Sequence, residues 1–425
     1  MFALLSPAAL SPGAAVGIDL GTTSSTIAVV RDGAPKIVHS LPSTVRFTDA
    51  SPLVGVGAPC IRSAKRLIGR SFTEVQNEPA VRAHFGPLLE NTDDAAALRC
   101  PSSDQTISPE EASAEILRAL LDAAEAETGE RADRAVIGVP AHFAKPQRDA
   151  TRAAASAVGL ESVKLLEEPV CAALAFGVSG ADDELAIVFD LGGGTLDVAL
   201  LMVGGGTCEV LSSAGEPWLG GDDVDTAVVK LLAKEEALGG LSARSGEALA
   251  AARALKEQLT VRKQAEVSEP ASITLSRKQL EAASKPLFTA MQAPVIRACE
   301  ASGVVLPGVV EDIGRGGKAA RGLPGGRPAA RPRAGHSLDR LLLVGAASRL
   351  HGLPKMLESL TGLRADTGVK PEEAVALGAA VQAGVLDGAL EQVDCIGVLE
   401  AAMIRGLASG KRASQSKRRG GRKKL

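Results

Sequence analysis

The chain has 425 residues, enough for two or three domains, and its formal net charge is −3. Hydrophobic residues make up 45% of it and aromatic residues only 2%, so a core must be built from Leu, Val and Ala. Residues 411–425 hold eight Lys and Arg and no acid, which leaves the rest acidic and argues against nucleic-acid binding through the general surface. For this basic tail we expect a solvated run, nuclear targeting or contact with anionic partners.

Nothing in the sequence indicates a membrane or secretory protein. Residues 1–15 lack a basic region, and no segment is long and apolar enough to span a bilayer. The cysteines are dispersed, without a CxxC pair or metal-ligand spacing, which is typical of thiols in a reducing compartment. We therefore expect a cytoplasmic protein without membrane contact, with an organelle or the nucleus as alternatives.

The first strong pattern is a hairpin between residues 16 and 41. The segment from Gly17 to Ser24 reads GIDLGTTS, and the apolar run TIAVV follows it. Two apolar runs around a Gly-rich turn predict a β-hairpin. Glycine lets a ligand approach the turn backbone closely, and Asp19 places a carboxylate beside that turn.

Helices and strands alternate after residue 107. Ser108 is a good N-cap, Pro109 suits the first helical position, and two acids follow in the first turn. The next elements that we predict are a strand over 134–139, a helix over 145–158, a strand over 163–166 and a helix over 169–176. This order is typical of an α/β layered fold.

Residues 188–201 then repeat the first hairpin. They read VFDLGGGT followed by LDVALL, with Asp190 in the place of Asp19. Two such hairpins that face each other supply two sets of backbone N–H groups and two carboxylates, which suits a polyphosphate and its metal ion. The repeat also predicts a duplicated domain with the ligand between its halves.

The region 314–335 breaks the pattern. It is rich in Gly, Pro and Arg and has almost no bulky apolar residue, so we predict a flexible basic insertion. An apolar strand over 341–344 resumes the α/β pattern after it.

In this order the segments resemble the nucleotide-binding domain of the 70-kDa heat-shock protein family of chaperones, over about Val16 to Gly388. Eight motifs carry the resemblance: GIDLGTTSS at Gly17, AKRLIGRSF at Ala64, VIGVPAHF at Val136, LLEEPVCAALAFG at Leu165, VFDLGGGTLDVALL at Val188, WLGGDDVD at Trp218, LLLVGAASRL at Leu341 and PEEAVALGAAVQAG at Pro371.

The resemblance implies an α/β chain with the actin-like ATPase fold, in which duplicated ribonuclease-H-like domains form two lobes around an ATP cleft. Lobe I would cover residues 1–180, with a small subdomain at about 42–108. Lobe II would cover 181–392, with a small subdomain at about 219–307 and the insertion at about 314–335. A degenerate linker at 393–410 and the basic tail at 411–425 would follow.

The resemblance also implies a set of site residues. Those implied for phosphate binding are Gly21, Thr22, Thr23, Gly192, Gly193, Gly194, Thr195, Gly220 and Gly221. Those implied near the adenosine are Lys256, Thr260, Gly345 and Arg349, and those implied for Mg²⁺ are Asp19 and Asp190, with K⁺ as a further candidate cation. Catalysis would rest on Lys65, Glu168, Asp190 and Thr195, which position the attacking water and stabilise charge on the phosphoryl group.

Several positions depart from the family pattern. Ala346 and Ala347 stand where the adenosine loop has Gly and Ser, which predicts weaker nucleotide binding. Arg253 stands where the family has a Glu that faces the ribose, and the segment 57–63 is short. From the motif positions we expect His142 to pack beside Phe143 and Trp218 to act as a wedge before a glycine turn.

The expected function is an ATP-binding and ATP-hydrolysing module that assists ATP-dependent protein folding. In this chain the basic tail follows the linker directly, so we expect the peptide-binding domain to be absent and clients to be reached only through a partner. A J-domain co-chaperone and a nucleotide-exchange factor are the implied partners. The alternative is a nucleotide-gated regulatory module, with little or no hydrolysis, that acts on partner chaperones.

Overall fold

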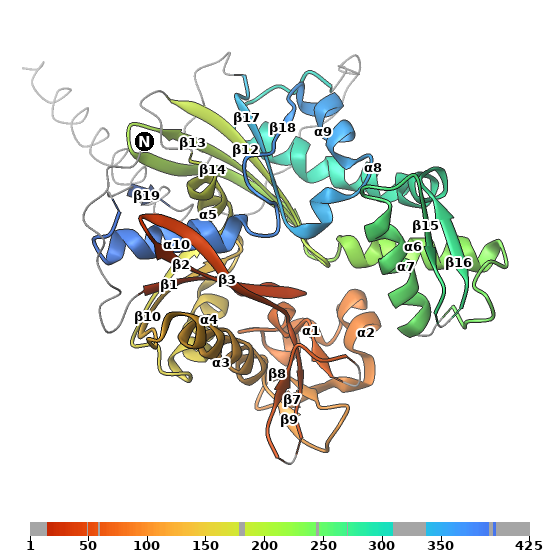
Figure 1. Ribbon diagram of the computed structural model, residues 1–425, viewed down its shortest axis with the longest axis horizontal. Helices are drawn as coiled ribbons and strands as arrows, with labels where there is room; N and C mark the ends of the chain where they lie inside the picture. The colour runs from red at the N-terminus through yellow and green to blue at the C-terminus, as the bar shows by residue number, and fades with distance from the viewer. Residues whose placement is uncertain are drawn as a thin grey trace, which may run out of the picture.

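Two large β-sheets form the centre of the molecule, one in each half of the chain (Figure 1). The computed structural model describes residues 15–48, 50–57, 60–177, 183–243, 246–269, 271–308, 337–390 and 394–396. The predicted insertion at 314–335, the basic tail and most of the predicted linker lie outside these residues.

The first sheet has the strand order β11-β10-β1-β2-β3. Its strands are β1 (Ala15–Asp19), β2 (Ser24–Arg31), β3 (Ala34–Pro42), β10 (Arg134–Val139) and β11 (Ser162–Glu167). The strands β1, β2 and β3 are antiparallel neighbours, whereas β10 and β11 join β1 in parallel. The predicted hairpin between residues 16 and 41 is therefore confirmed.

The second sheet repeats this plan. Its order is β18-β17-β12-β13-β14-β19, with β12 (Glu184–Leu191), β13 (Leu196–Gly204), β14 (Thr207–Glu216), β17 (Arg340–Val344), β18 (Ala365–Asp366) and β19 (Asp394–Ile396). Again three antiparallel strands are followed by two parallel ones, and β19 adds a parallel edge strand beside β14. The shared topology confirms the predicted duplication, and we call the two halves lobe I and lobe II.

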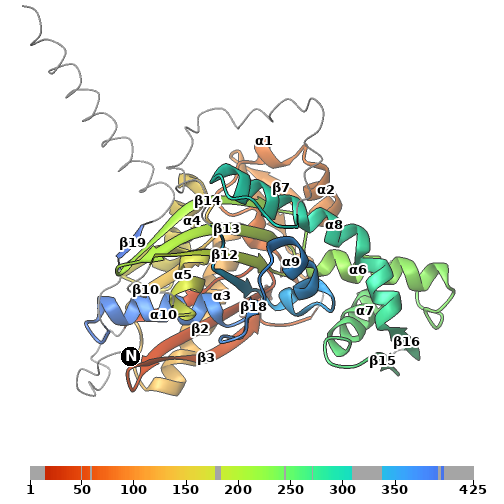
Figure 2. The same ribbon diagram turned by 90° about the horizontal axis from the view of Figure 1, so that it is seen from above.

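Two helices fill the space between the sheets (Figures 1 and 2). Helix α5 (Glu168–Ala175) follows the last strand of the first sheet and packs against the second, whereas α10 (Ala374–Leu386) comes from lobe II and packs against β1, β2 and β10. The helices also contact each other. Their residues are small: a Cβ at Gly378 would collide with the carbonyl of Cys171. The Ala- and Gly-rich composition thus lets two sheets share a thin helical layer.

Other helices cover the outer faces of the sheets. Helix α3 (Pro109–Thr128) and α4 (Lys145–Ser156) belong to lobe I, and α8 (Arg277–Ala301) lies against β13 and β14 of lobe II. The predicted cap is confirmed, because the Ser108 hydroxyl accepts from the backbone N–H of Glu111, whose side chain accepts from that of Ser108. Within the described residues, no helix is both long and apolar enough to cross a bilayer.

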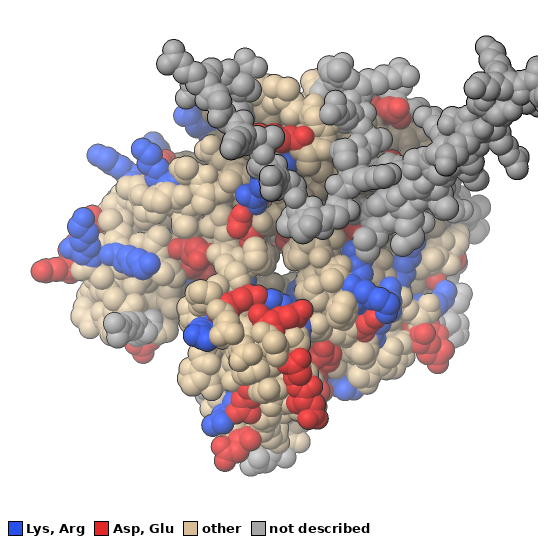
Figure 3. Space-filling model, turned by 180° about the vertical axis from the view of Figure 1, so that it is seen from behind, with Lys and Arg blue, Asp and Glu red and all other residues tan. Residues whose placement is uncertain are grey.

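Each lobe carries a smaller subdomain that extends beside the cleft. In lobe I it consists of β4 (Thr44–Arg46), β5 (Leu53–Val54), β6 (Ile61–Arg62), η1 (Ala64–Arg66), α1 (Phe72–Val75), α2 (Pro79–Phe85), η2 (Gly86–Leu88), β7 (Leu89–Thr92), β8 (Ala95–Arg99) and β9 (Thr106–Ile107). In lobe II it consists of α6 (Gly221–Lys234), α7 (Gly246–Gln258), β15 (Gln264–Val267) and β16 (Ile273–Ser276), with η3 (Ala346–Arg349) and α9 (Leu353–Thr361) nearby. Figure 3 shows an opening between the lobes on the rear face, above a group of acidic side chains on the lobe I subdomain.

The contact between α5 and α10 gives a first prediction. Gly378→Ala puts a methyl group into the carbonyl of Cys171, so we expect a loss of about 1–3 kcal/mol in the free energy of unfolding. Urea denaturation followed by circular dichroism measures it. Gly246→Ala in α7 is the control, since a Cβ there meets open space and should be neutral or slightly stabilising. Equal stability of the two variants would contradict this account of the interface.

Candidate functional site

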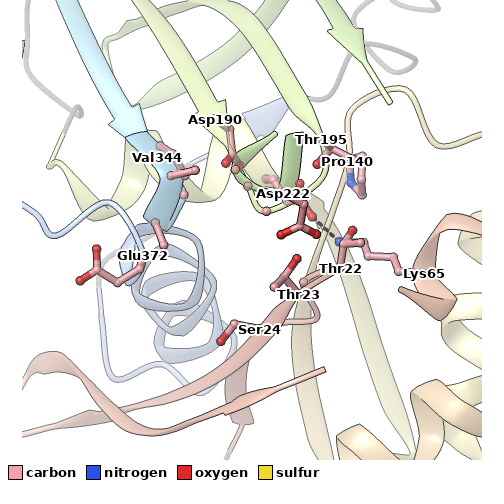
Figure 4. A pocket seen from close by; sticks show the side chains of 18 of the residues that line it. Thr22, Thr23, Ser24, Lys65, Pro140, Asp190, Thr195, Asp222, Val344 and Glu372 are labelled. Carbon is pink, nitrogen blue, oxygen red and sulfur yellow. Dashed lines mark hydrogen bonds and ion pairs between the residues drawn. The ribbon is translucent and has the colours of Figure 1, made fainter. Parts of the chain in front are cut away.

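A cavity of about 920 Å³ lies between the two lobes and their small subdomains (Figure 4). This volume is within the range of sites for small molecules and cofactors. Its wall combines the turns that end β1 and β12 with residues of η1, α5, α7 and η3. The wall includes Asp19, Gly21, Thr22, Thr23, Lys65, Glu168, Asp190, Gly192, Gly193, Thr195, Gly221, Lys256, Thr260, Gly345 and Arg349.

The two repeated turns face each other across this cavity. A Cβ at Gly193 in lobe II would collide with the Thr23 side chain in lobe I, so only a glycine permits this approach. The Gly192 N–H donates to the Thr195 carbonyl at 3.0 Å and closes the second turn. Figure 4 shows Thr22 and Thr23 on one side of the cavity and Thr195 with Asp190 on the other.

The N-terminus of α6 is fastened to the second turn by backbone hydrogen bonds. The backbone N–H groups of Gly221 and Asp222 donate to the carbonyls of Gly192 and Gly193, at 3.0 and 2.6 Å. The helix of 14 residues therefore begins directly behind the turn. The Gly220 N–H donates to the Asp223 carboxylate at 2.8 Å, so the first donors of α6 are paired within the protein and fix the shape of the turn.

Three carboxylates and one lysine occupy the centre of the cavity: Glu168 is buried, and Asp19, Asp190 and Lys65 are half-buried. The Lys65 ammonium and the Glu168 carboxylate are 2.6 Å apart, and each side chain is only 10% exposed. Burial and repulsion from Glu168 raise the pKa of Asp19 to about 7, and the same two causes hold the pKa of Asp190 well above its usual range. Burial disfavours the Lys65 ammonium, but the charges of Glu168 and Asp19 outweigh it and raise the pKa of Lys65.

This charge distribution fits a divalent cation. Asp19 and Asp190 hold excess negative charge that Lys65 alone does not neutralise, and carboxylate oxygens are the ligands that Mg²⁺ prefers. Among the described residues, no group of three or more His, Cys, Asp or Glu is placed to hold a metal by itself. The arrangement therefore suits an ion that keeps several waters and is shared with substrate phosphates, as Mg²⁺ is.

At the other end of the cavity the cations are already paired. The Lys256 ammonium lies 2.7 Å from a carboxylate oxygen of Asp225, which is 1% exposed, and donates to the Gly221 carbonyl at 3.1 Å. Arg253 also binds Asp225, at 3.0 Å. Lys256 thus secures α7 against the start of α6, a role that its motif position did not reveal.

The loop with the altered sequence lies at this same end. Ala346 and Ala347 begin η3 and line the cavity, and Arg349 forms a two-bonded ion pair with Glu372 at 2.7 and 2.8 Å. Two predicted ligand residues, Gly194 and Gly220, are not in the cavity wall. Gly220 packs behind Gly193, and the Gly194 carbonyl accepts a hydrogen bond from Arg66 at 2.7 Å.

Sequence reasoning missed several contacts between the lobes. His142 does contact Phe143, with ring centroids 5.7 Å apart, but its Nδ1 also lies 3.0 Å from the Asp197 carboxylate of lobe II. Despite partial burial, the hydrogen bond and charge of Asp197 raise the pKa of His142. The contact of Arg66 with lobe II was missed as well. Two signals pointed to it: Arg66 directly follows Lys65, and the small residues of the turns leave room for a long side chain.

Comparison with known proteins supports one family. The model of the family described as Hsp70 protein matches residues 15–317 and 333–401. A chaperone protein DnaK of Thermus thermophilus is 35% identical over 413 residues, which cover 89% of this chain and 62% of that protein. The DnaK proteins of Prochlorococcus marinus and Cyanidioschyzon merolae are 34% and 33% identical, with 60% and 63% of their lengths covered. The chain thus spans less than two thirds of the length of these relatives.

The Asp19 carboxyl gives a prediction about pH. Its pKa is about 7 in the folded chain against 3.8 in the unfolded chain, so between pH 4 and 7 the folded state binds more protons. Stability therefore falls as the pH rises through this window, by up to about 1.4 kcal/mol per pH unit for one group. Asp19→Asn removes this loss, so its advantage over wild type should grow from pH 5 to pH 7.

The measurement is the thermal midpoint at each pH, without added metal or nucleotide. Asp32→Asn is the control, because the exposed Asp32 pairs with Lys36, which lowers the pKa of that carboxyl and keeps it ionised over this window. A constant difference between Asp19→Asn and wild type at all pH values would contradict the assignment.

Proposed function

This chain belongs to the Hsp70 family of chaperones, which has the actin-like ATPase fold, and we propose that its cavity binds ATP or ADP with Mg²⁺ and hydrolyses ATP slowly. One observation carries the proposal. The two glycine–threonine turns face each other directly beside the buried group of Asp19, Glu168, Asp190 and Lys65. Two sets of backbone donors next to excess negative charge suit a polyphosphate with its cation.

In this proposal each lobe holds one side of the phosphates. Lobe I contributes Gly21, Thr22 and Thr23, and lobe II contributes the turn from Gly192 to Thr195 together with Gly221. Gly194 and Gly220 lie behind the cavity wall. Because they carry no Cβ, they allow the turn and α6 to pack closely. The nucleoside end is formed by Lys256, Thr260, Gly345 and Arg349.

Hydrolysis rests on positioning and charge rather than on covalent chemistry. The Lys65 ammonium, held at 2.6 Å by Glu168, is fixed where it stabilises the charge that develops on the transferred phosphoryl group. Glu168 and the Thr195 hydroxyl orient the attacking water, with Asp190 beside them. Asp19 and Asp190 would hold Mg²⁺, which would neutralise phosphate charge, and K⁺ is a candidate second cation.

The chaperone role extends the same proposal. Pro140 lies in the cavity wall, and Arg148 donates to the Glu167 carboxylate at 3.1 Å and to the Phe143 carbonyl at 2.9 Å. These contacts connect the cavity to α4, a path by which nucleotide state reaches partners. We infer a J-domain co-chaperone and a nucleotide-exchange factor as partners, with unfolded clients reached through a partner.

The nucleoside end of the cavity favours a second candidate, a nucleotide-gated regulatory module with little hydrolysis. At the nucleoside end Lys256 and Arg349 are already paired with Asp225 and Glu372, and Ala346 and Ala347 offer no hydroxyl. Both features weaken nucleotide binding. A single-turnover assay with radiolabelled ATP separates the candidates, since only the ATPase converts bound ATP to ADP within minutes.

The Lys65–Glu168 pair gives a prediction about rate. Lys65→Met should bind Mg²⁺-ATP but hydrolyse it at least about 100-fold more slowly, because loss of one charge-stabilising group typically costs that much. The single-turnover rate constant measures this. Lys36→Met, at an exposed lysine paired with Asp32, is the control and should match wild type. If Lys65→Met hydrolyses ATP at the wild-type rate, the assigned role is wrong.

The altered loop gives a prediction about affinity. Ala346→Gly with Ala347→Ser removes a Cβ and adds a hydroxyl at the nucleoside end, so Kd for Mg²⁺-ATP should fall by a factor of about 10, the value of one added hydrogen bond. Isothermal calorimetry measures it. Ala365→Ser in β18, outside the cavity wall, should leave Kd unchanged. An unchanged Kd in the double variant would show that this loop does not limit binding.

A further inference from the structure

Arg66 reaches from one lobe to the other. It lies in η1 of lobe I, and its Nη2 donates to the Gly194 carbonyl of lobe II at 2.7 Å. Its Nη1 donates to the Pro217 carbonyl, and its guanidinium carbon lies 4.0 Å from the centre of the Trp218 ring. One side chain thus makes two hydrogen bonds and a cation–π contact across the cleft.

Trp218 makes the reverse contact. It belongs to lobe II, in the segment between β14 and α6, yet its ring packs against the hydrophobic core of lobe I. The His84 ring of α2 lies 5.7 Å from it. The contact between the lobes therefore has an apolar part and a polar part, formed by neighbouring side chains.

Burial and a close fit distinguish the contact of Arg66 from an accidental pairing of surface side chains. Burial lowers the pKa of Arg66 to about 10, so its guanidinium has given up much of its water. The carbonyls of Gly194 and Pro217 take the place of that water. The guanidinium packs so closely behind the turn that a Cβ at Gly194 would collide with it. Separation of the lobes removes both carbonyl partners and the ring contact together.

We propose that Arg66 and Trp218 form a clasp that holds the two lobes closed over the phosphate turns, and that this clasp limits the rate of nucleotide release. The proposal rests on the proposed nucleotide binding. Lys65 and Arg66 are adjacent, so any movement of the lobe I subdomain away from lobe II both breaks the clasp and withdraws Lys65 from the cavity. Release of a nucleotide held between the turns requires that movement.

The first test needs no nucleotide. Trp218 is the single tryptophan of the chain, so intrinsic fluorescence reports on it alone. Arg66→Gln should increase acrylamide quenching of Trp218, because the ring loses its cover. Arg62→Gln, at an exposed arginine of the same subdomain, is the matched control and should quench like wild type. Unchanged quenching in Arg66→Gln would overturn the clasp, whether or not the chain binds nucleotide.

The second test measures release. A fluorescent ADP analogue bound with Mg²⁺ is chased with excess ADP in a stopped-flow instrument. Arg66→Gln and Trp218→Leu should each release it about tenfold faster or more, from the loss of charged hydrogen bonds and the ring contact, and Arg62→Gln at the wild-type rate. The double variant should release it no faster than the faster single variant, because both changes break one contact.

The outcomes separate the two proposals. Unchanged release in Arg66→Gln with increased quenching would show that the contact exists but does not govern release, which overturns the inference. No binding of the analogue to wild type would refute the proposed function, and quenching would still decide whether the clasp forms. Arg66→Lys guards against misfolding: it keeps the charge but loses the planar fork, so it should lie between wild type and Arg66→Gln.

Discussion

The central constraint on this molecule is the sharing of one ammonium group by three carboxylates where the lobes meet. Lys65 bonds to Glu168, while burial and repulsion from Glu168 raise the pKa values of Asp19 and Asp190. A buried charge without compensation is costly, so the site stores an unfavourable interaction that a cation can relieve. In the proposed function, ligand binding and closure of the lobes are therefore coupled through the same few atoms.

The fold makes this arrangement by exchanging helices between the halves. Helix α5 leaves the first sheet and supports the second, and α10 returns from lobe II to support the first. Glu168 begins α5, so the carboxylate that holds Lys65 is fixed at the point where the chain passes between the sheets. The scarcity of aromatic residues agrees with this layer, where small side chains allow close packing of helices.

Much of this architecture could be predicted from local patterns. The hairpins around Asp19 and Asp190, the cap at Ser108 and the strand over 134–139 depend on residues that are neighbours in the sequence, and the structure confirms them. The pairing of the catalytic candidates depended on the family resemblance, since Lys65 and Glu168 are 103 residues apart. Position in a motif indicates that a residue lies in the site, but it does not indicate which side chain that residue contacts.

The partners that could not be predicted are those set by tertiary packing. Lys256 is bound by Asp225 because α7 lies against α6, and His142 reaches Asp197 because the turn after β10 meets the start of β13 across the cleft. Arg66 and Pro217 are 151 residues apart, and a basic residue beside Lys65 carries no sign of its target. Such contacts depend on the relative position of the lobes, which no local pattern encodes.

Two opposing forces therefore act at one interface. Repulsion among Asp19, Glu168 and Asp190 favours separation of the lobes, whereas the contacts of Arg66 and Trp218 favour closure. Because Lys65 and Arg66 are adjacent in one short helix, the two forces act on the same segment. In the proposed function, a bound cation with a polyphosphate would remove the repulsion without touching the closing contacts, so binding would shift the balance toward the closed form. Departure of the cation would restore the repulsion and allow the cleft to open.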